Sequence, residues 1–194
     1  MHDSINLPFH QHAMLLCSKD DGGADELALK YVNEALMREH LTIYISANID
    51  NNNLSGISER TSKIINYEDK VNQGNLLTLD LRPFYDSALA GDEQAFEELK
   101  VIIEAAINER TTSGKSHEVT IVSSIAGTLA ANQKFKQCIN VEKWGQNTHS
   151  EWSKKGLKVT TICPHPSPTL DKSELMHYKQ AISSLHHVTL DPGC

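Results

Sequence analysis

The segment from Ala13 to Ser46 constrains the fold more than any other part of the chain. It starts with a short apolar run, Met14–Cys17, and continues through a loop rich in Asp and Gly. A long amphipathic stretch follows, and then a second apolar run, Ile43–Ile45. Short apolar runs that alternate with amphipathic stretches are typical of the strands and helices of a parallel α/β sheet. The segment therefore predicts a strand–loop–helix–strand unit that opens such a sheet.

The rest of the 194-residue chain continues this alternation. Apolar runs predict strands at Leu41–Ser46, Asn75–Leu81, Val119–Ser123, Leu157–Cys163 and, as a short sixth strand, His187–Leu190. Helical periodicity predicts helices at about 24–39, within 54–72, and at 92–110, 129–155 (with a break near Gly145) and 171–185. Prolines predict turns at Arg82–Tyr85 and 164–168, and Ile125–Gly127 is expected to begin a loop.

These elements predict an α/β fold. We expect a three-layer α/β/α sandwich around a mainly parallel sheet of five or six strands. Residues 1–12 are interpreted as a polar lead-in, and residues 13–190 as a single domain.

The loop after the first strand stands where nucleotide-binding proteins carry the phosphate-binding motif GxxxxGK[ST]. Alignment on the following helix puts Ala24 at the position of the lysine and Asp25 at that of the metal-binding Ser/Thr. The strand that would supply the magnesium-binding acid ends instead in Ser123. Lys19 is the only cation of the loop and stands beside Asp20, so the loop would repel a triphosphate. The sequence therefore predicts that ATP hydrolysis has been lost.

Composition excludes several other classes of function. The formal net charge of −7, without a basic stripe, argues against nucleic-acid binding. No apolar stretch is long enough to span a membrane. The four cysteines are far apart and form no CxxC pair, which favours a reducing cytoplasm over a disulfide framework.

Ligands of open parallel sheets bind outside the carboxyl ends of the strands. Polar and soft side chains follow several of the predicted strands, which suits a small polar ligand. The candidate ligand-binding residues at this edge are Cys17, Ser18, Asp20, Asp25, Asp80, Arg82, Ser123, Ser124, Cys163 and His165.

Three other interpretations of these residues stay open. Cys17, Cys163 and His165 could converge on zinc, although cysteines at strand ends are more often buried small hydrophobes. A cysteine nucleophile with His165 as its base has no evident third orienting residue. His12, His186 and His187 are candidates for a pH-sensitive element, although the pair near the end of the last predicted helix is also what a helix carboxyl terminus favours.

The segments LLCSKDDGGADELALKYVNEALMREHLTIYIS, VTIVSSIAGTLA and KKGLKVTTICPHP resemble the core of the KaiC/RecA-like ATPases. Within that group the chain is most similar to the MEDS (methanogen/methylotroph DcmR sensory) domains, which lack the phosphate loop. These domains share an early His, a strand that ends in Cys, and a following helix that ends in His. The matching positions are His10 or His12, Cys163, and His186 or His187.

The resemblance implies a RecA-like fold that senses a ligand and has no catalytic residues. We therefore expect a non-catalytic sensory or regulatory module without a cofactor or resident metal, with an unknown small-molecule ligand and a protein partner. The alternatives are an interaction protein that forms homo-oligomers or assists an active KaiC/RecA-like ATPase, and a small cysteine-dependent enzyme.

Overall fold

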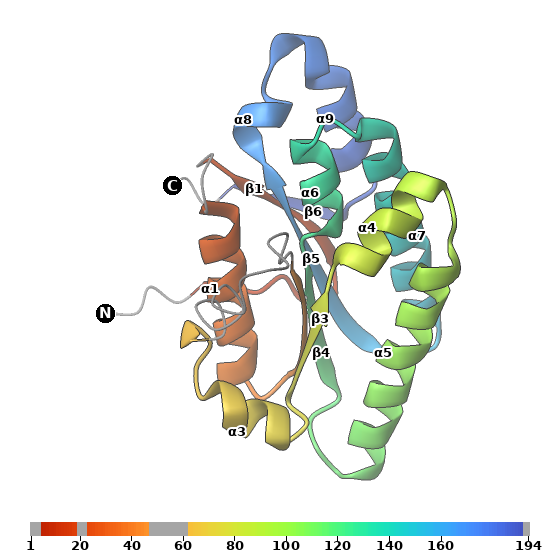
Figure 1. Cartoon of the computed structure of the whole chain (residues 1–194). Coiled ribbons are helices and arrows are strands. Elements are labelled where there is room, and N and C mark those ends of the chain that lie inside the picture. Colours follow the sequence, from red (N-terminus) through yellow and green to blue (C-terminus); the bar gives the residue numbers. More distant parts are fainter. Residues whose placement is uncertain (1–4, 19–22, 47–61, 192–194) are drawn as a thin grey trace.

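A computed structural model describes residues 5–18, 23–46 and 62–191. Six parallel strands form one sheet through its centre (Figure 1). They are β1 (His12–Cys17), β2 (Leu41–Ser46), β3 (Leu76–Asp80), β4 (Glu118–Ser123), β5 (Lys158–Pro166) and β6 (Val188–Leu190). Their order across the sheet is β3-β2-β4-β5-β1-β6. The predicted parallel sheet is confirmed, and His12, assigned to the lead-in, is the first residue of β1.

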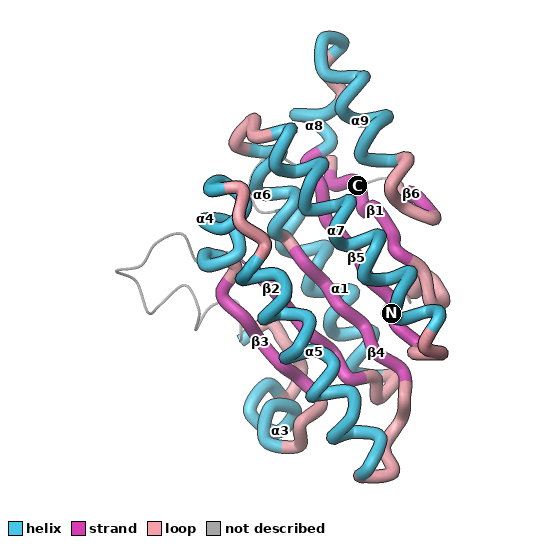
Figure 2. The backbone as a smooth tube through the Cα atoms, turned by 90° about the vertical axis from the view of Figure 1, so that its right-hand side faces the viewer, coloured by secondary structure: helices cyan, strands magenta, loops and turns pink. Residues whose placement is uncertain are grey.

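Helices cover both faces of the sheet, which confirms the predicted three layers (Figures 1 and 2). One face carries α1 (Gly23–Met37) and α3 (Tyr67–Asn72). The other carries α4 (Arg82–Ala90), α5 (Gln94–Thr112), α6 (Ile125–Ala131), α7 (Phe135–Lys154), α8 (Ser167–Leu170) and α9 (Met176–Ser183). Among the described helices, none has the length and apolar character needed to cross a membrane.

Alternation along the strands divides the core into two clusters. Successive side chains of a strand point to opposite faces of the sheet. In β1, Leu15 and Cys17 therefore pack against α1, whereas Met14 and Leu16 pack against the helices of the opposite layer. All six residues of β1 are buried, as expected for a strand whose two faces are both covered.

Two segments predicted to be irregular are helical instead. Pro83 does not turn the chain away but lies in the first turn of α4, where its missing N–H is not needed and its fixed φ suits a helix. Ile125–Gly127 likewise opens α6.

The long helix predicted over 129–155 is two helices. The helix is interrupted between Ala131 and Phe135, where Gln133 has a φ of 58°, and α7 is continuous at Gly145. The last predicted helix, 171–185, is also divided, into a 3₁₀ turn at Ser173–Leu175 and α9.

β5 continues to Pro166, through residues for which the prolines predict a corner. The amide of Thr161 donates a hydrogen bond on the β1 side. By alternation, the positions of Pro164 and Pro166 face the β4 side, and the last pairing of β5 with β4 is at Ile162. The two prolines therefore remove no hydrogen bond from the sheet, because their side of β5 is already an edge.

Candidate functional site

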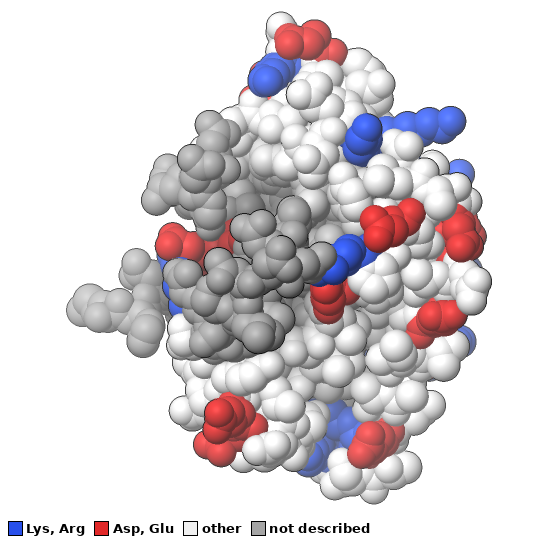
Figure 3. Space-filling view, in the orientation of Figure 1, with Lys and Arg blue, Asp and Glu red and all other residues white. Residues whose placement is uncertain are grey.

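The carboxyl edge of the sheet holds some of the predicted ligand-binding residues, but two of them, Asp80 and Arg82, already bond to each other. Asp80 ends β3, and its carboxylate accepts hydrogen bonds from the backbone amide and the Nη2 of Arg82, at 3.0 and 3.3 Å. The two charges thus neutralise each other on an exposed surface. Figure 3 shows this face with positive and negative side chains interspersed.

Four other residues predicted for that edge are not members of the buried polar group described below, although one of them, Ser123, lines the cavity beside it: Ser18, Asp25, Ser123 and Ser124. Ser18 is exposed directly after β1, and Asp25 lies in the first turn of α1. Ser123 ends β4, and the amide of Ser124 donates to the carbonyl oxygen of Ile45 on β2. Asp20 lies outside the described residues.

Cys17 and Cys163, two of the three predicted zinc ligands, are not brought together. Cys17 packs in the cluster beneath α1. Cys163 lies opposite Met14 in the register of β5 and β1, and Met14 belongs to the other cluster. Cys17 lies three positions after Met14, which is an odd offset, so the pleat turns the sulfurs of Cys17 and Cys163 to opposite faces of the sheet.

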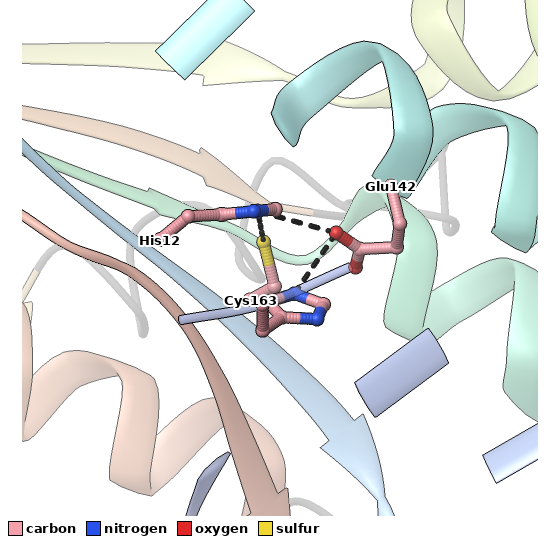
Figure 4. Close-up of side chains that lie close together, drawn as sticks. His12, Glu142 and Cys163 are labelled. Carbon is pink, nitrogen blue, oxygen red and sulfur yellow. Dashed lines mark hydrogen bonds and ion pairs between the residues drawn. The ribbon is translucent and has the colours of Figure 1, made fainter. Parts of the chain in front are cut away.

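The structure instead gathers polar side chains on the α7 side of the sheet. His12 comes from β1 and Cys163 from β5. The His12 ring points toward Glu142 of α7, and the sulfur of Cys163 points toward the His12 ring (Figure 4). His165 of β5 and His186, from the loop between α9 and β6, complete this group, which we call the core cluster. It is built from four separate parts of the chain.

Short distances link the members of the core cluster. His12 Nε2 lies 3.4 Å from Cys163 Sγ and 3.3 Å from Glu142 Oε2. His165 Nε2 donates to Glu142 Oε1 at 2.7 Å. His186 Nε2 lies 3.0 Å from Glu142 Oε2, yet it has no partner in hydrogen-bond geometry. The rings of His12 and His186 stack with centroids 4.2 Å apart.

Oxygen atoms outside the core cluster set the tautomers of two histidines. His12 Nδ1 lies 3.0 Å from Gln146 Oε1 and 3.1 Å from the carbonyl oxygen of Leu185. His186 Nδ1 lies 2.8 Å from the carbonyl oxygen of Ile182. These oxygens accept, so each Nδ1 must carry the proton and donate it. Nε2 of each ring therefore faces the core cluster, and it offers a lone pair there whenever the ring is neutral.

The core cluster is almost inaccessible to solvent. His12 and His165 are fully buried, Glu142 is 1% exposed and Cys163 is 6% exposed. Burial alone would raise the pKa of Glu142, but the charge of His186 and the hydrogen bonds of His12 and His165 outweigh it and hold that pKa well below its usual range. Burial lowers the pKa of His186, but the Glu142 carboxylate outweighs it and raises that pKa overall. The core cluster thus contains a buried ion pair.

The thiol of Cys163 is poorly suited to act as a nucleophile. Burial, and then the nearby charge of Glu142, raise its pKa well above the usual value. The thiolate is the reactive form of cysteine, so this environment suppresses reactivity unless a cation joins the site.

A cavity of about 50 Å³ borders the core cluster at His12, Glu142 and Cys163. Its other walls are mainly apolar and come from β2, β4, α5, α6 and α7, with Phe96 and Trp144 among them. The volume exceeds the roughly 10–15 Å³ that one buried water needs. Space for an ion or a very small molecule therefore adjoins the polar groups.

Several donor atoms are close enough to bind one metal ion. Among the described residues, the ligand atoms of His12, Glu142, Cys163 and His186 all lie within 4.8 Å of one another. His187, also predicted from the sequence, is exposed and bonds to the backbone of His12: its ring Nδ1 accepts from the His12 amide at 2.9 Å. It is therefore a neighbour of the core cluster and not a member.

Glu142 is the residue that the sequence analysis missed. It lies on the buried side of α7, where Cys138, Glu142, His149 and Trp152 are all buried at helical spacing. A carboxylate within an otherwise apolar or aromatic stripe is unusual, because burying it unpaired is costly. That break in the pattern was the available signal.

Comparison with known proteins leaves the chain without a family assignment: it matches no protein-family model and no curated protein.

Proposed function

We propose that this chain is a non-catalytic sensory or regulatory module that does not use ATP and binds its ligand at the core cluster. One observation carries the proposal: a carboxylate, a thiol and three imidazoles lie together inside the apolar core, beside a cavity.

Such a group is expensive for a protein that needs only to fold. Replacement of a buried ion pair by apolar side chains of similar volume is often neutral, or stabilises the fold by about 1–4 kcal/mol. Binding sites are where proteins commonly retain such unfavourable groups. The burial of Glu142 and His186 therefore favours a role in binding over a role in stability.

The resemblance to MEDS domains agrees with this position for the site. The His, Cys and His that the resemblance implies fit His12, Cys163 and His186, which lie together in the structure. The high pKa of Cys163 argues against a cysteine-dependent enzyme. Ala24 and Ser123, at the positions of the lysine and the acid, argue against ATP hydrolysis.

The first test separates a binding role from a structural role. In the triple variant Glu142→Met, His165→Leu, His186→Leu, the charges are removed at similar volume, and we expect the metal-free protein to be as stable as wild type or more stable, by about 1–4 kcal/mol in urea unfolding. Arg110→Met is the matched control. Arg110 is also buried, but it donates to Ser116 O, Asn75 Oδ1 and Glu39 O, so its loss leaves acceptors unpaired and destabilises.

A triple variant as unstable as Arg110→Met would make the core cluster structural and contradict the proposal.

The second test is isothermal titration of the full chain with Mg-ATP, together with a turnover assay. We expect neither binding nor hydrolysis, and micromolar binding with magnesium-dependent turnover would overturn the proposal.

A second candidate, an interaction protein, is favoured by one feature of α5. Val101 and Ile102 are 67% and 43% exposed and adjacent in sequence. An exposed apolar pair of this kind suits contact with a second copy of the chain or with an active ATPase. Light scattering on wild type and on the double variant Val101→Asp, Ile102→Asp tests this candidate. An oligomeric wild type and a monomeric variant would support contact between copies, and a monomeric wild type would argue against it.

The proposal also places the protein in the cytoplasm. In the described part of the chain, Cys138 and Cys163 carry reduced thiols, which suits a reducing compartment.

A further inference from the structure

We propose that the core cluster is a zinc site, with His12 Nε2, Glu142 Oε2, Cys163 Sγ and His186 Nε2 as the four ligands. This inference rests on the proposed function, because it names the ligand of the same site.

The donor set is suited to zinc. Zinc binds imidazole nitrogen, thiolate sulfur and carboxylate oxygen, and structural sites take four such ligands in a tetrahedron. A thiolate selects against magnesium and calcium, which prefer oxygen ligands alone.

The distances between the donor atoms approach the edges of such a tetrahedron. Zinc–nitrogen and zinc–oxygen bonds of about 2.0–2.1 Å and a zinc–sulfur bond of about 2.3 Å give edges of roughly 3.3–3.6 Å. The distances from His12 Nε2 to Cys163 Sγ and Glu142 Oε2 are 3.4 and 3.3 Å, and Glu142 Oε2 lies 3.0 Å from His186 Nε2. All four donors lie within 4.8 Å of one another, so small shifts of the side chains would complete the coordination.

The outer contacts orient the ligands as a metal site requires. Metal-binding histidines generally donate their other ring N–H to an oxygen, which fixes the tautomer. His12 Nδ1 does so toward Gln146 Oε1 and Leu185 O, and His186 Nδ1 toward Ile182 O. His165 occupies Glu142 Oε1, which leaves Oε2 for the ion.

The contact of one buried nitrogen points to the same position. His186 Nε2 lies 3.0 Å from Glu142 Oε2 but outside hydrogen-bond geometry, and it makes no hydrogen bond among the described residues. Coordination to a metal would satisfy this nitrogen.

Charge balance gives an independent reason. A zinc ion of charge +2, with one thiolate and one carboxylate, forms a neutral centre, and two neutral imidazoles leave it so. Binding forms the zinc–sulfur bond and releases the Cys163 thiol proton to solvent. The proton that His186 Nε2 carries in its ion pair with Glu142 leaves as well when the zinc–nitrogen bond forms. A neutral centre suits the apolar surroundings, which include Phe96 and Trp144.

Cobalt titration of the full, chelator-treated chain tests the site, with zinc competition to follow. We expect one Co²⁺ per chain, with a thiolate-to-cobalt charge-transfer band and strong visible bands of a tetrahedral site, and their loss when one equivalent of Zn²⁺ is added. Cys163→Ala should abolish the charge-transfer band. Cys17→Ala, an equally buried cysteine on the other face, should retain it.

Two further variants separate ligands from neighbours. His186→Ala should weaken zinc binding at least 100-fold, whereas His187→Ala, next to it but exposed, should change it less than 10-fold. Gln146→Ala should weaken binding by about 10–100-fold, because it frees the His12 ring. Circular dichroism establishes that each variant is folded.

A folded wild type that takes up neither Co²⁺ nor Zn²⁺ at micromolar concentrations would overturn the zinc site, as would loss of the band in Cys17→Ala. If zinc binding fails while the triple variant is stable and ATP is not bound, the proposed function stands with another ligand. If zinc binds and ATP is hydrolysed, the zinc site stands and the proposed function fails.

Discussion

Gly127 and Gly145 are helical glycines on the same side of the sheet, but their surroundings differ. A β-carbon on Gly127 of α6 would lie 1.9 Å from the carbonyl oxygen of Pro164, in the backbone of β5. A β-carbon on Gly145 of α7 would meet only the His12 ring, at an ordinary contact distance of 3.5 Å. Gly127 is therefore needed for the close approach of α6 to β5, whereas Gly145 is not needed for packing.

The alanine variants of these two glycines should shift stability in opposite directions. Gly127→Ala should destabilise by about 1–3 kcal/mol or more, because the backbone of β5 must move. Gly145→Ala should stabilise by up to about 1 kcal/mol, because alanine favours a helix. Urea unfolding of the two variants under one set of conditions measures both. Equal effects would show that α6 does not approach β5 as described.

At the scale of elements, α5 and α7 are joined by polar contacts along their outer sides. Glu104 of α5 accepts hydrogen bonds from the Trp152 indole and the Lys155 ammonium of α7, both at 2.9 Å. Lys100 also forms an ion pair with Glu151, at 2.5 Å. The hydrogen bond from Lys155, opposed by burial and helped by Trp152, holds the pKa of Glu104 below the ordinary value of 4.5.

This contact should make stability depend on pH in a defined direction. A carboxylate with a lowered folded-state pKa stabilises fully above its unfolded pKa, and the effect is lost as the pH falls through the folded value. Wild type should therefore exceed Glu104→Gln by about 0.5 kcal/mol at pH 7, and the difference should vanish as the pH falls below 4.5. Urea unfolding from pH 7 to 3 measures it, with Glu68→Gln, exposed on α3, as control. A difference that grows toward low pH would contradict this account.

The sheet and the order of its elements were predictable because they depend on local periodicity. Apolar runs predict strands such as Leu41–Ser46, and β2 has these same bounds in the structure. The turns predicted at the prolines were wrong. A helix tolerates Pro83 because it lies in the first turn, and a strand tolerates Pro166 because β4 ends before it. Neither is a local property of the sequence.

The candidate site was less predictable than the fold. The strand ends identified Cys163 and His165, but that set also held Cys17. The resemblance left open His10 or His12 and His186 or His187. The pleat that separates Cys17 from Cys163 depends on register, which requires the paired sheet. Glu142 comes from a helix that packs across this sheet, so no rule about strand ends could include it.

For the whole molecule, the core cluster ties the last part of the chain to the centre. β6 pairs with β1 at three positions, and Ile182 is the only buried residue of α9. His186 lies between them and reaches Glu142 of α7. An ion bound to the His186 ring would thus hold α9–β6 against α7 and the centre of the sheet.

Zinc should therefore protect α9–β6 more than the remainder of the chain. At zinc 100-fold above the Kd, binding stabilises the closed form by about 2.7 kcal/mol. Amides that exchange when α9–β6 detaches should then slow by up to about 100-fold. Amides of α5 that exchange through local opening, while α9–β6 stays in place, should not change. Hydrogen exchange with and without zinc measures this, and Glu142→Gln should lose the effect. If zinc slowed every segment alike, the ion would be acting on global unfolding, and α9–β6 would not be a separately controlled element.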